Sequence, residues 1–370
     1  MEVLKAAAAR QRSHGDALMM CVGQPSTGAP RAVVNQAHAV LDSQVMGYTD
    51  ATGIPELREV IAKHHRDWYN INVTADDVVV MTGSSGAFSL LFLAAFEAGD
   101  TVAMTRPGYP AYRNTLSALG CNVLEIDCGA DTRFQPTVAM LEALDEVPKG
   151  LIVASPSNPT GTVIDPDELA AIARWCEAHD CLLISDEIYH GLTYGRAASS
   201  AWETSKAGVV IGSVSKYFSM TGWRLGWALV PPHLRRPMEI LSQNLTICAP
   251  AITQYAAMAA FGEDAKPELQ NHLERYAVNR EIVKAALADM GLSSAPPDGA
   301  FYAWCDIGHL TDDSTAWCTE VLETTGVALT PGVDFDTVKG HRMMRFSFAG
   351  STAEVTEALG RLAASPLLQS

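Results

Sequence analysis

Short, wholly apolar runs alternate with longer mixed segments through the middle of the chain. Each run ends at a turn rich in Gly, Ser or Pro or at a polar cluster, and the segments at 87–96 and 166–179 have the length of helices. Such runs are typical of strands buried on both faces of a sheet. The alternation predicts an α/β architecture with strands at 78–81, 102–104, 151–154, 181–184 and 209–211.

The two ends of the chain carry other patterns. Residues 1–20 predict a helix, which leads into an apolar segment that ends in Gly23-Gln24-Pro25. Segments 298–304 and 343–348 alternate between apolar and polar positions, as strands do. The amphipathic stretch at 269–290 predicts a long helix that can bridge two lobes.

Composition and charge limit the classes of protein to which the chain can belong. The chain has 370 residues, enough for about two domains, and its 48% hydrophobic and 18% charged content is that of an ordinary globular protein. A net charge of −16 argues against a nucleic acid or an anionic membrane as the main partner. Two long uncharged stretches, at 78–96 and 240–262, are interrupted by polar residues or Pro, unlike a bilayer helix. We expect the second one to be buried or to lie at a subunit interface.

Cysteine and histidine spacing gives no sign of a metal site. The eight cysteines include no C-x-x-C pair and no metal-ligand spacing with histidine, so we interpret them as reduced thiols in the core. His64 and His65 have no ligand partners at helical spacing, and we expect them to be solvated. The start of the chain lacks the apolar region of a secretory signal, which predicts a cytoplasmic protein.

The chemistry of the chain centres on the segment from Ser213 to Trp227. An apolar strand runs into Lys216, and a lysine that is desolvated at a strand end can form a Schiff base with a carbonyl cofactor. Ser213 and Arg224 supply the short donor and the planar cation that a phosphate needs. A surface lysine and arginine in a loop are the alternative on local grounds.

This segment reads S-x-S-K-x-x-x-x-x-G-W-R-x-G and resembles the pyridoxal-phosphate lysine segment of the class I/II aminotransferases (aspartate aminotransferase superfamily, fold type I). S-N-P-T-G at 157–161 and S-D-E-x-Y at 185–189 are similar to two further motifs of that family, in the same order. The resemblance extends from Gly23 to Arg345.

The resemblance implies a two-domain architecture. The large domain, at 45–275, would hold a mostly parallel sheet of the seven-stranded type between helices. Residues 1–44 and 276–370 would form a smaller α/β domain from both chain ends. The family also implies a homodimer with shared active sites.

The resemblance assigns a cofactor site for pyridoxal 5′-phosphate. Lys216 would carry the cofactor, and Asp186 would pair with its protonated pyridine nitrogen, which suits a buried carboxylate that needs a partner. Asn158, held between two prolines, and Tyr189 would donate to the phenolic oxygen. The remaining matches are Tyr109 for ring stacking and, for the phosphate, Ser84, Ser85, Ser213, Arg224 and Tyr48 from the partner subunit.

For some of these residues, a purely structural role is the alternative. Tyr48 and Tyr109 suit a packed interface or loop equally well, and a structural ion pair is the alternative for Asp186. The Gly/Ser turn at 82–86 presents free N–H groups to an anion, but is a weak signal alone. Glu187 and His190 are assigned no role.

The substrate would bind beside Arg345. An arginine within an apolar strand is costly unless it meets an anion, and this one matches the family arginine that holds the substrate α-carboxylate. Gly23 and Asn158 match the neighbouring substrate-binding positions. The alternative for Arg345 is an arginine on an edge strand that faces solvent. The alternative for Gly23 is a simple turn. Phe301 and Tyr302 are candidates for the side-chain pocket, with core packing as the alternative.

Charge predicts the substrate class. Some dicarboxylate-specific relatives use an additional Lys or Arg, but none occurs between Arg66 and Arg106 or between Arg236 and Lys266. We therefore expect an L-amino acid with a neutral, aliphatic side chain, such as alanine or valine, as donor, and pyruvate or 2-oxoglutarate as acceptor. An aspartate-type aminotransferase and a carbon–sulfur β-lyase are the alternatives. A non-enzymatic metabolite-sensing module is disfavoured, because the chain is acidic and has no room for a DNA-binding domain.

Overall fold

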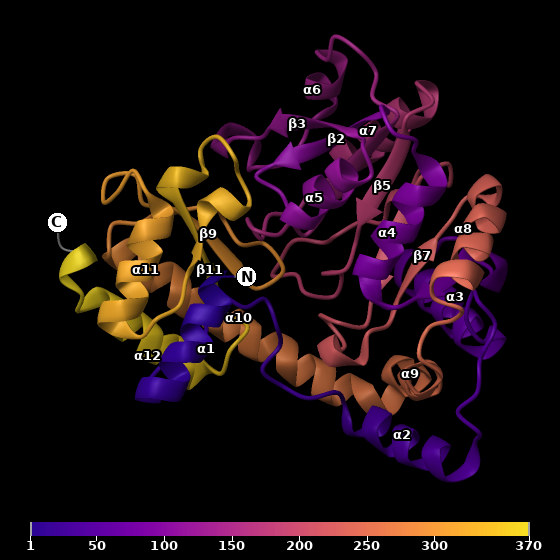
Figure 1. The fold of residues 1–370 in the computed structure, drawn as a ribbon, viewed down its shortest axis with the longest axis horizontal. Helices are drawn as coiled ribbons and strands as arrows, with labels where there is room; N and C mark the ends of the chain where they lie inside the picture. Colours follow the sequence, from indigo (N-terminus) through magenta and orange to yellow (C-terminus); the bar gives the residue numbers. More distant parts are fainter. Residues whose placement is uncertain (1, 369–370) are drawn as a thin grey trace.

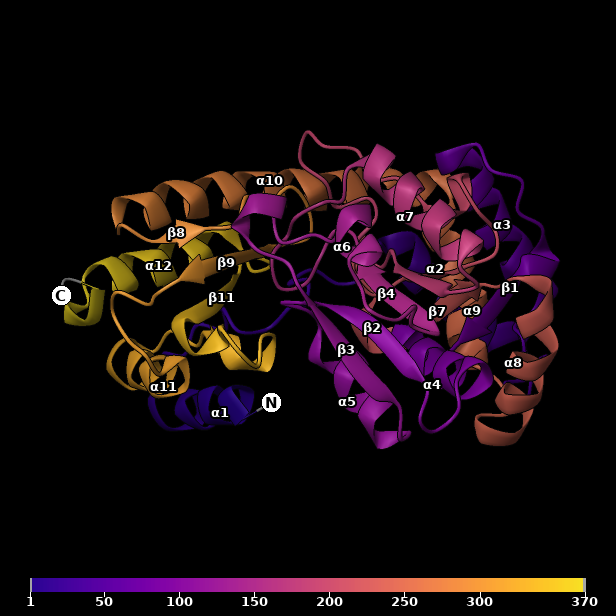
Figure 2. The ribbon, with the colours of Figure 1, turned by 90° about the horizontal axis from the view of Figure 1, so that it is seen from above.

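The computed structural model describes residues 2–368, so residues 1, 369 and 370 of the predicted small domain lie outside the described part. Two domains lie side by side, one around each of two sheets, and one long helix runs along both (Figures 1 and 2). The helices are α1 (Glu2–His14), α2 (Arg31–Ser43), α3 (Pro55–Tyr69), α4 (Gly83–Ala95), α5 (Pro110–Ala118), α6 (Val138–Glu142), α7 (Pro166–Ala178), α8 (Pro232–Leu245), α9 (Ala251–Ala257), α10 (Lys266–Asp289), α11 (Ser314–Thr325) and α12 (Thr352–Ala363).

The large domain holds a seven-stranded sheet in the order β1-β7-β6-β5-β4-β2-β3. Only β7 runs antiparallel to its neighbours, so the predicted mostly parallel, seven-stranded α/β sheet is confirmed. The strands are β1 (Val78–Met81), β2 (Thr101–Arg106), β3 (Asn122–Asp127), β4 (Gly150–Ala154), β5 (Leu182–Asp186), β6 (Val209–Ser213) and β7 (Gly226–Leu229).

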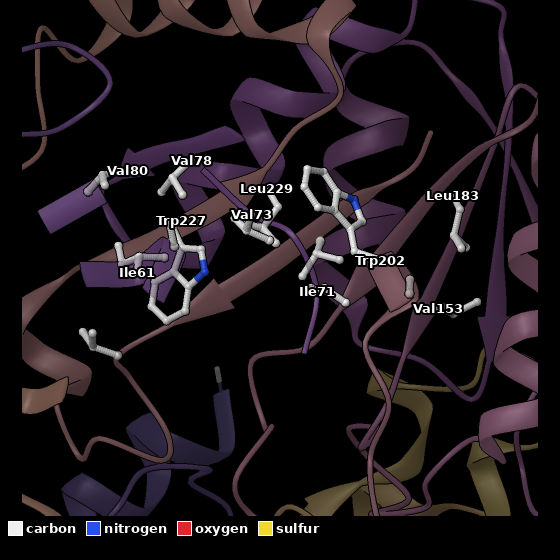
Figure 3. Close-up of a cluster of buried hydrophobic side chains, with 14 of the residues drawn as sticks. Ile61, Ile71, Val73, Val78, Val80, Val153, Leu183, Trp202, Trp227 and Leu229 are labelled. Carbon is white, nitrogen blue, oxygen red and sulfur yellow. The ribbon is translucent and has the colours of Figure 1, made fainter. Parts of the chain in front are cut away.

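Helices bury both faces of this sheet, which explains the continuous apolar runs. Along β1, Val78 and Val80 pack on one face with residues of α3, α7 and α9, while Val79 and Met81 pack on the other with α4, α5 and α8. Figure 3 shows the first of these cores, where Trp227 from β7 lies beside Ile61 from α3.

The same core corrects the prediction for His65. This residue is buried, and the indole Nε1–H of Trp227 donates to its Nε2 at 3.0 Å. Burial lowers the pKa of His65 well below its usual value. It is therefore a neutral core histidine, and only its neighbour His64 retains partial exposure. The expectation of solvation failed because α3 is covered on this side by the aromatic residues after Lys216.

The small domain holds a four-stranded antiparallel sheet in the order β10-β11-β9-β8. Its core packs between that sheet and α10, α11 and α12. The strands predicted at 298–304 and 343–348 correspond to β9 and β11. The bounds are β8 (Ser293–Ser294), β9 (Tyr302–Asp306), β10 (Thr330–Pro331) and β11 (Met343–Ser347).

Helix α10 connects the two domains as predicted. Leu269 near its start packs in the core of the large domain, whereas Tyr276, Val283 and Leu287 pack in the core of the small domain. In Figure 2, α10 runs the length of the small domain and continues over the large one.

Two predicted boundaries are wrong at the N-terminal end. The first helix ends at His14 rather than at residue 20, because Gly15 adopts a left-handed conformation (φ +74°) that stops it. Helix α2, which was predicted within the small domain, packs against α9, and its Val33 and Ala37 join the core of the large domain. The segment 31–43 therefore belongs with the large domain.

Among the described residues, no helix is both long enough and apolar enough to cross a membrane. The uncharged stretch at 240–262 is divided between α8, α9 and a short 3-10 turn.

Candidate active site

A cavity of about 600 Å³ lies where the strands of the large sheet end and the small domain begins. Asp186 and Ala154, the last residues of the parallel strands β5 and β4, both line it, which is the edge where α/β sheets bind ligands. We call the part lined by Ser84, Ser85, Asp186, Ser215 and Arg224 the cofactor end. The substrate end is lined by Val22, Gly23, Tyr302, Phe335 and Arg345.

Lys216 reaches the cavity three residues after β6. Its Nζ donates to the carbonyl of Gly23 at 2.8 Å, so it lies where the two ends meet. Burial, with a smaller contribution from the charge of Arg345, lowers the pKa of Lys216 to about 8. A substantial fraction of the amine is then neutral near pH 8, as a nucleophile or base requires.

Asp186 is a buried carboxylate without a cationic partner. The phenol of Tyr112 donates to its Oδ2, and the amide of Ile188 donates to its Oδ1 at 3.2 Å. Burial raises the pKa of Asp186 to about 6, and these two hydrogen bonds limit the rise. No Lys, Arg or His among residues 2–368 forms an ion pair with it, which argues against a structural ion pair. A protonated ring nitrogen would supply the missing positive charge.

Tyr112 was missed by sequence reasoning. It is fully buried, lines the cavity and meets both Asp186 and the ring of Tyr109, which lies at 5.4 Å in an edge-on arrangement. The repeated tyrosine in P-G-Y-P-A-Y was the available signal, because residues three apart in the first turn of α5 share a face.

Two tyrosines line the cavity between β5 and the small domain. The hydroxyls of Tyr189 and Tyr302 are 2.8 Å apart, and burial raises the pKa of Tyr189 well above its usual value. Tyr189 therefore remains a protonated hydroxyl. Tyr302 faces the cavity, whereas Phe301 is buried in the core of the small domain, which is the packing alternative for that residue.

Arg345 is held at the substrate end by neutral groups. It is only 6% exposed and lies on β11, an inner strand, so the edge-strand alternative is wrong. Its guanidinium donates to Asn158 Oδ1 at 2.8 Å and to the carbonyl of Cys21 at 2.7 Å, between the rings of Tyr302 and Phe335. No carboxylate of the described residues pairs with it. A buried cation balanced only by neutral groups is suited to an anionic ligand.

The contact with Arg345 also orients Asn158. A guanidinium only donates, so the amide oxygen of Asn158 faces it and the NH₂ group is left as the donor toward the cavity. Gly23 is required here by space, because a Cβ at this position would lie 1.8 Å from the Tyr302 hydroxyl oxygen. The turn alternative for Gly23 therefore does not account for the residue.

Backbone amides and Arg224 converge at the cofactor end. Ser84 and Ser85 lie in the first turn of α4, where free N–H groups and the helix dipole favour an anion. A Cβ on Gly83 would lie 2.5 Å from Nη2 of Arg224, so the arginine packs directly against this turn. This arrangement is suited to a phosphate monoester.

Two predicted phosphate residues do not line the cavity. Ser213 is buried, and its hydroxyl donates to Ser215 Oγ (2.9 Å) and to the carbonyl of Leu225 (3.2 Å); Ser215 lines the cavity in its place. Tyr48 is 83% exposed on the surface of its own chain. Their phosphate roles remain predictions.

Comparison with known proteins identifies the family. A family model described as aminotransferase class I and II matches residues 16–362. The chain belongs to this family. Family membership implies pyridoxal phosphate as the cofactor and an amino acid and a 2-oxo acid as substrates.

Relatives of this aminotransferase match over nearly its whole length. A Mycobacterium tuberculosis protein named valine–pyruvate aminotransferase is 53% identical over 365 residues, covering 98% of this chain and 94% of the relative. The crystal structure of an aminotransferase from the same organism superposes with a TM-score of 0.97 at 53% identity (98% and 95% of the two chains). The Thermus thermophilus aspartate aminotransferase with maleate gives 0.93 at 31% identity, with the same coverage.

The cavity of this aminotransferase fits the implied cofactor. Its lining combines the polar groups that pyridoxal phosphate requires: helix N–H groups and Arg224 for the phosphate, an amine at Lys216 for the aldehyde and a buried carboxylate at Asp186 for the ring nitrogen. The described residues contain no group of His, Cys, Asp and Glu side chains that could hold a metal ion.

Proposed function

We propose that this enzyme transfers the amino group of a neutral, aliphatic amino acid, such as valine or alanine, to a small 2-oxo acid, with pyruvate as the favoured acceptor. The charge of the cavity carries the proposal. Its lining among the described residues contains three cations, Lys216, Arg224 and Arg345, and each already has a partner in the reaction. A second carboxylate on the substrate would be buried unpaired, which costs several kcal/mol.

The walls of the substrate end support an aliphatic side chain. Val3 and Leu4 from α1 line the cavity together with Val22 and Phe335. Each methylene group of the substrate that is buried against such a surface contributes about 0.8 kcal/mol. The M. tuberculosis relative, whose name gives valine and pyruvate as substrates, supports the same class.

The side chains that line the cavity have separate roles in the proposed amino-group transfer. Bound pyridoxal phosphate supplies an aldehyde for the amine and an electron-withdrawing ring next to the substrate Cα. Asp186 would hold the proton on the ring nitrogen, and Arg345 and the Asn158 amide would orient the α-carboxylate. Lys216, with its lowered pKa, would accept the proton from the substrate Cα and deliver it to the carbon of the cofactor that carried the aldehyde. Tyr189 would donate a hydrogen bond from its hydroxyl to the phenolic oxygen of the bound cofactor.

We further propose that the enzyme is a homodimer in which Tyr48 of each chain reaches the partner's phosphate site. Apolar side chains stand exposed along residues 41–48, with Val45 at 93%, and along the end of α8 at Leu245 and Ile247. The two segments are adjacent, because the Ser242 hydroxyl donates to the carbonyl of Ala51 at 2.8 Å. An apolar surface of this kind marks an interface.

The proposal also includes a cytoplasmic location. All eight cysteines are unpaired thiols, including Cys176 and Cys181, whose side chains are in contact. Thiols that persist in this state are typical of a reducing compartment.

The first half of the transamination, in which an amino acid reacts with the cofactor without an acceptor, tests the proposed function. The purified holoenzyme is mixed with single amino acids without an acceptor, and the absorbance change of the cofactor ranks the donors. We expect valine and alanine to react fastest, and pyruvate to reverse the change more efficiently than 2-oxoglutarate. A kcat/KM for aspartate above that for valine contradicts the proposed substrate class. Release of pyruvate from a sulfur amino acid without an acceptor supports the β-lyase alternative instead.

A further inference from the structure

A second carboxylate faces the cavity. Asp334 is the last residue of a 3-10 turn (Gly332–Asp334) that follows β10, and it lines the cavity beside Phe335. The ring of Phe335 lies 4.7 Å from Cζ of Arg345. Asp334 therefore lies on the cavity wall next to a residue of the substrate end, and no part of the proposed reaction uses it.

The charge of Asp334 is not paired within the described chain. No Lys, Arg or His of residues 2–368 forms an ion pair with it. Arg113 donates to the backbone carbonyl of Asp334 at 3.3 Å, but its guanidinium pairs with Glu125 at 3.0 Å. Of the other cations that line the cavity, Arg224 lies at the cofactor end and Lys216 where the two ends meet.

The effect of Asp334 on a neighbouring thiol helps to locate its charge. Burial raises the pKa of Cys318, and the Asp334 carboxylate is the next contribution, followed by Cys21. Cys21 is itself a cavity wall residue, and its carbonyl accepts a hydrogen bond from Arg345. Asp334 is thus near α11 and Cys21 as well as on the cavity wall.

We propose that Asp334 is a specificity-determining residue that repels the second carboxylate of dicarboxylic donors and acceptors. This inference rests on the proposed function and deepens it. The absence of a spare lining cation only leaves a second carboxylate unpaired, whereas Asp334 adds a like charge to the cavity wall next to Phe335. Because donor and acceptor occupy one cavity in turn, the same repulsion acts on aspartate and on 2-oxoglutarate, and it spares valine and pyruvate.

The test compares substrate ratios in the holoenzyme. Asp334→Asn removes the charge at nearly constant shape. We expect the ratio of kcat/KM for aspartate to that for valine to rise about tenfold, and the ratio for 2-oxoglutarate to pyruvate to rise similarly, which corresponds to about 1.4 kcal/mol. Asp334→Glu keeps the charge and should retain a ratio near that of the wild type. The matched control is Asp312→Asn, an exposed carboxylate outside the cavity, which should leave both ratios unchanged.

The outcomes separate this inference from the function on which it rests. If the wild type prefers valine and Asp334→Asn leaves both ratios unchanged, the role of Asp334 is refuted and the proposed function stands. If the wild type prefers aspartate, the proposed function itself fails. If the wild type reacts fastest with lysine or ornithine and Asp334→Asn loses that activity, Asp334 attracts a cationic side chain, and the repulsion proposal is overturned.

Discussion

The two ends of the cavity are built from different parts of the chain and by different means. At the cofactor end, polar groups lie within a few residues of β1, β5, β6 and β7, so the large sheet fixes their positions. At the substrate end, Gly23, Tyr302 and Arg345 come from an N-terminal segment and two strands of the small domain. The cofactor end is therefore built from the large domain, to which the proposal adds Tyr48 of the partner subunit. The substrate end is built from the N-terminal segment and the small domain, and the contact between Arg345 and Asn158 joins it to the large domain.

Substitutions at the two ends of the cavity should therefore have different effects on the kinetics. Changes at the cofactor end should affect the reaction of every substrate alike, because the same cofactor serves all of them. Changes at the substrate end should alter KM and the ranking of substrates. Four substitutions test this difference between the two ends, with expected effects that decrease from Lys216→Ala to Tyr48→Phe.

Lys216→Ala should have the largest effect, because it removes the amine that moves the proton at the substrate Cα. We expect kcat to fall by about 10⁴-fold for valine and for alanine alike. Single-turnover absorbance measurements with each amino acid check this. Lys206→Ala, a surface lysine that contacts Trp202, is the control and should keep wild-type kcat. A loss that differs strongly between the two donors would contradict this difference between the two ends.

Arg345→Lys keeps a positive charge but loses the planar fork that binds a carboxylate in two places. We expect kcat/KM for valine to fall by roughly 100-fold, mostly through KM, since one member of a buried charge pair is disrupted. Steady-state kinetics with varied valine and pyruvate measure the effect. Arg342→Lys changes an exposed arginine that pairs with Asp306, and should behave as the wild type. A fall confined to kcat would place the effect at the cofactor end.

Asp186→Asn should reveal the cost of the unpaired carboxylate in the apoprotein. Burial raises the pKa of Asp186 to about 6, above its usual value near 4, so the folded apoprotein binds this proton more tightly than the unfolded chain does. The ionised carboxylate therefore destabilises the fold by an amount that is absent well below pH 4, grows between pH 4 and 6 and is complete above pH 6.

At pH 7.5 this cost is of the order of 2–3 kcal/mol. We expect denaturant unfolding to show that Asp186→Asn stabilises the apoprotein at pH 7.5 and that the stabilisation is about threefold smaller at pH 4.5. The same variant should bind pyridoxal phosphate more weakly, since the ring nitrogen loses its counter-charge. Equal stability of the two apoproteins at both pH values would show that the carboxylate is already satisfied without the cofactor.

Tyr48→Phe should have the smallest effect of the four. It removes one hydrogen bond to a charged group across the proposed dimer interface, which corresponds to roughly a tenfold loss of cofactor affinity. Fluorescence titration of the apoprotein with pyridoxal phosphate measures it, and the valine-to-aspartate ratio should not change. Val45→Asp is the companion variant, and sedimentation should show that it weakens the dimer. If Tyr48→Phe binds the cofactor as tightly as the wild type, Tyr48 does not reach the phosphate.

The cofactor end was the more predictable of the two from sequence. Its residues occur in contiguous motifs that follow apolar runs, so Lys216 and Asp186 were placed correctly at strand ends. That Ser215 rather than Ser213 lines the cavity was not predictable, because it depends on how the chain turns after β6. Tyr112 was missed because its contact with Asp186 joins segments 74 residues apart.

The substrate end was predicted mainly through Arg345, whose charge interrupts an apolar strand. Phe335, Asp334 and the α1 residues Val3 and Leu4 gave no local signal, because they reach the cavity only through the packing of the small domain. The edge strand β3 was also missed, since its half-exposed residues lack a continuous apolar run.

Helix α10 forms a stiff connection between the two domains. Its 24 residues span about 36 Å without an internal glycine, and its start and its remaining length are fixed in separate cores. It therefore acts as a stiff lever: a tilt of about 5° at Leu269 moves the far end by about 3 Å, given the length above. A rearrangement next to the large sheet would thus displace the small domain, which carries Tyr302 and Arg345, relative to the cofactor end.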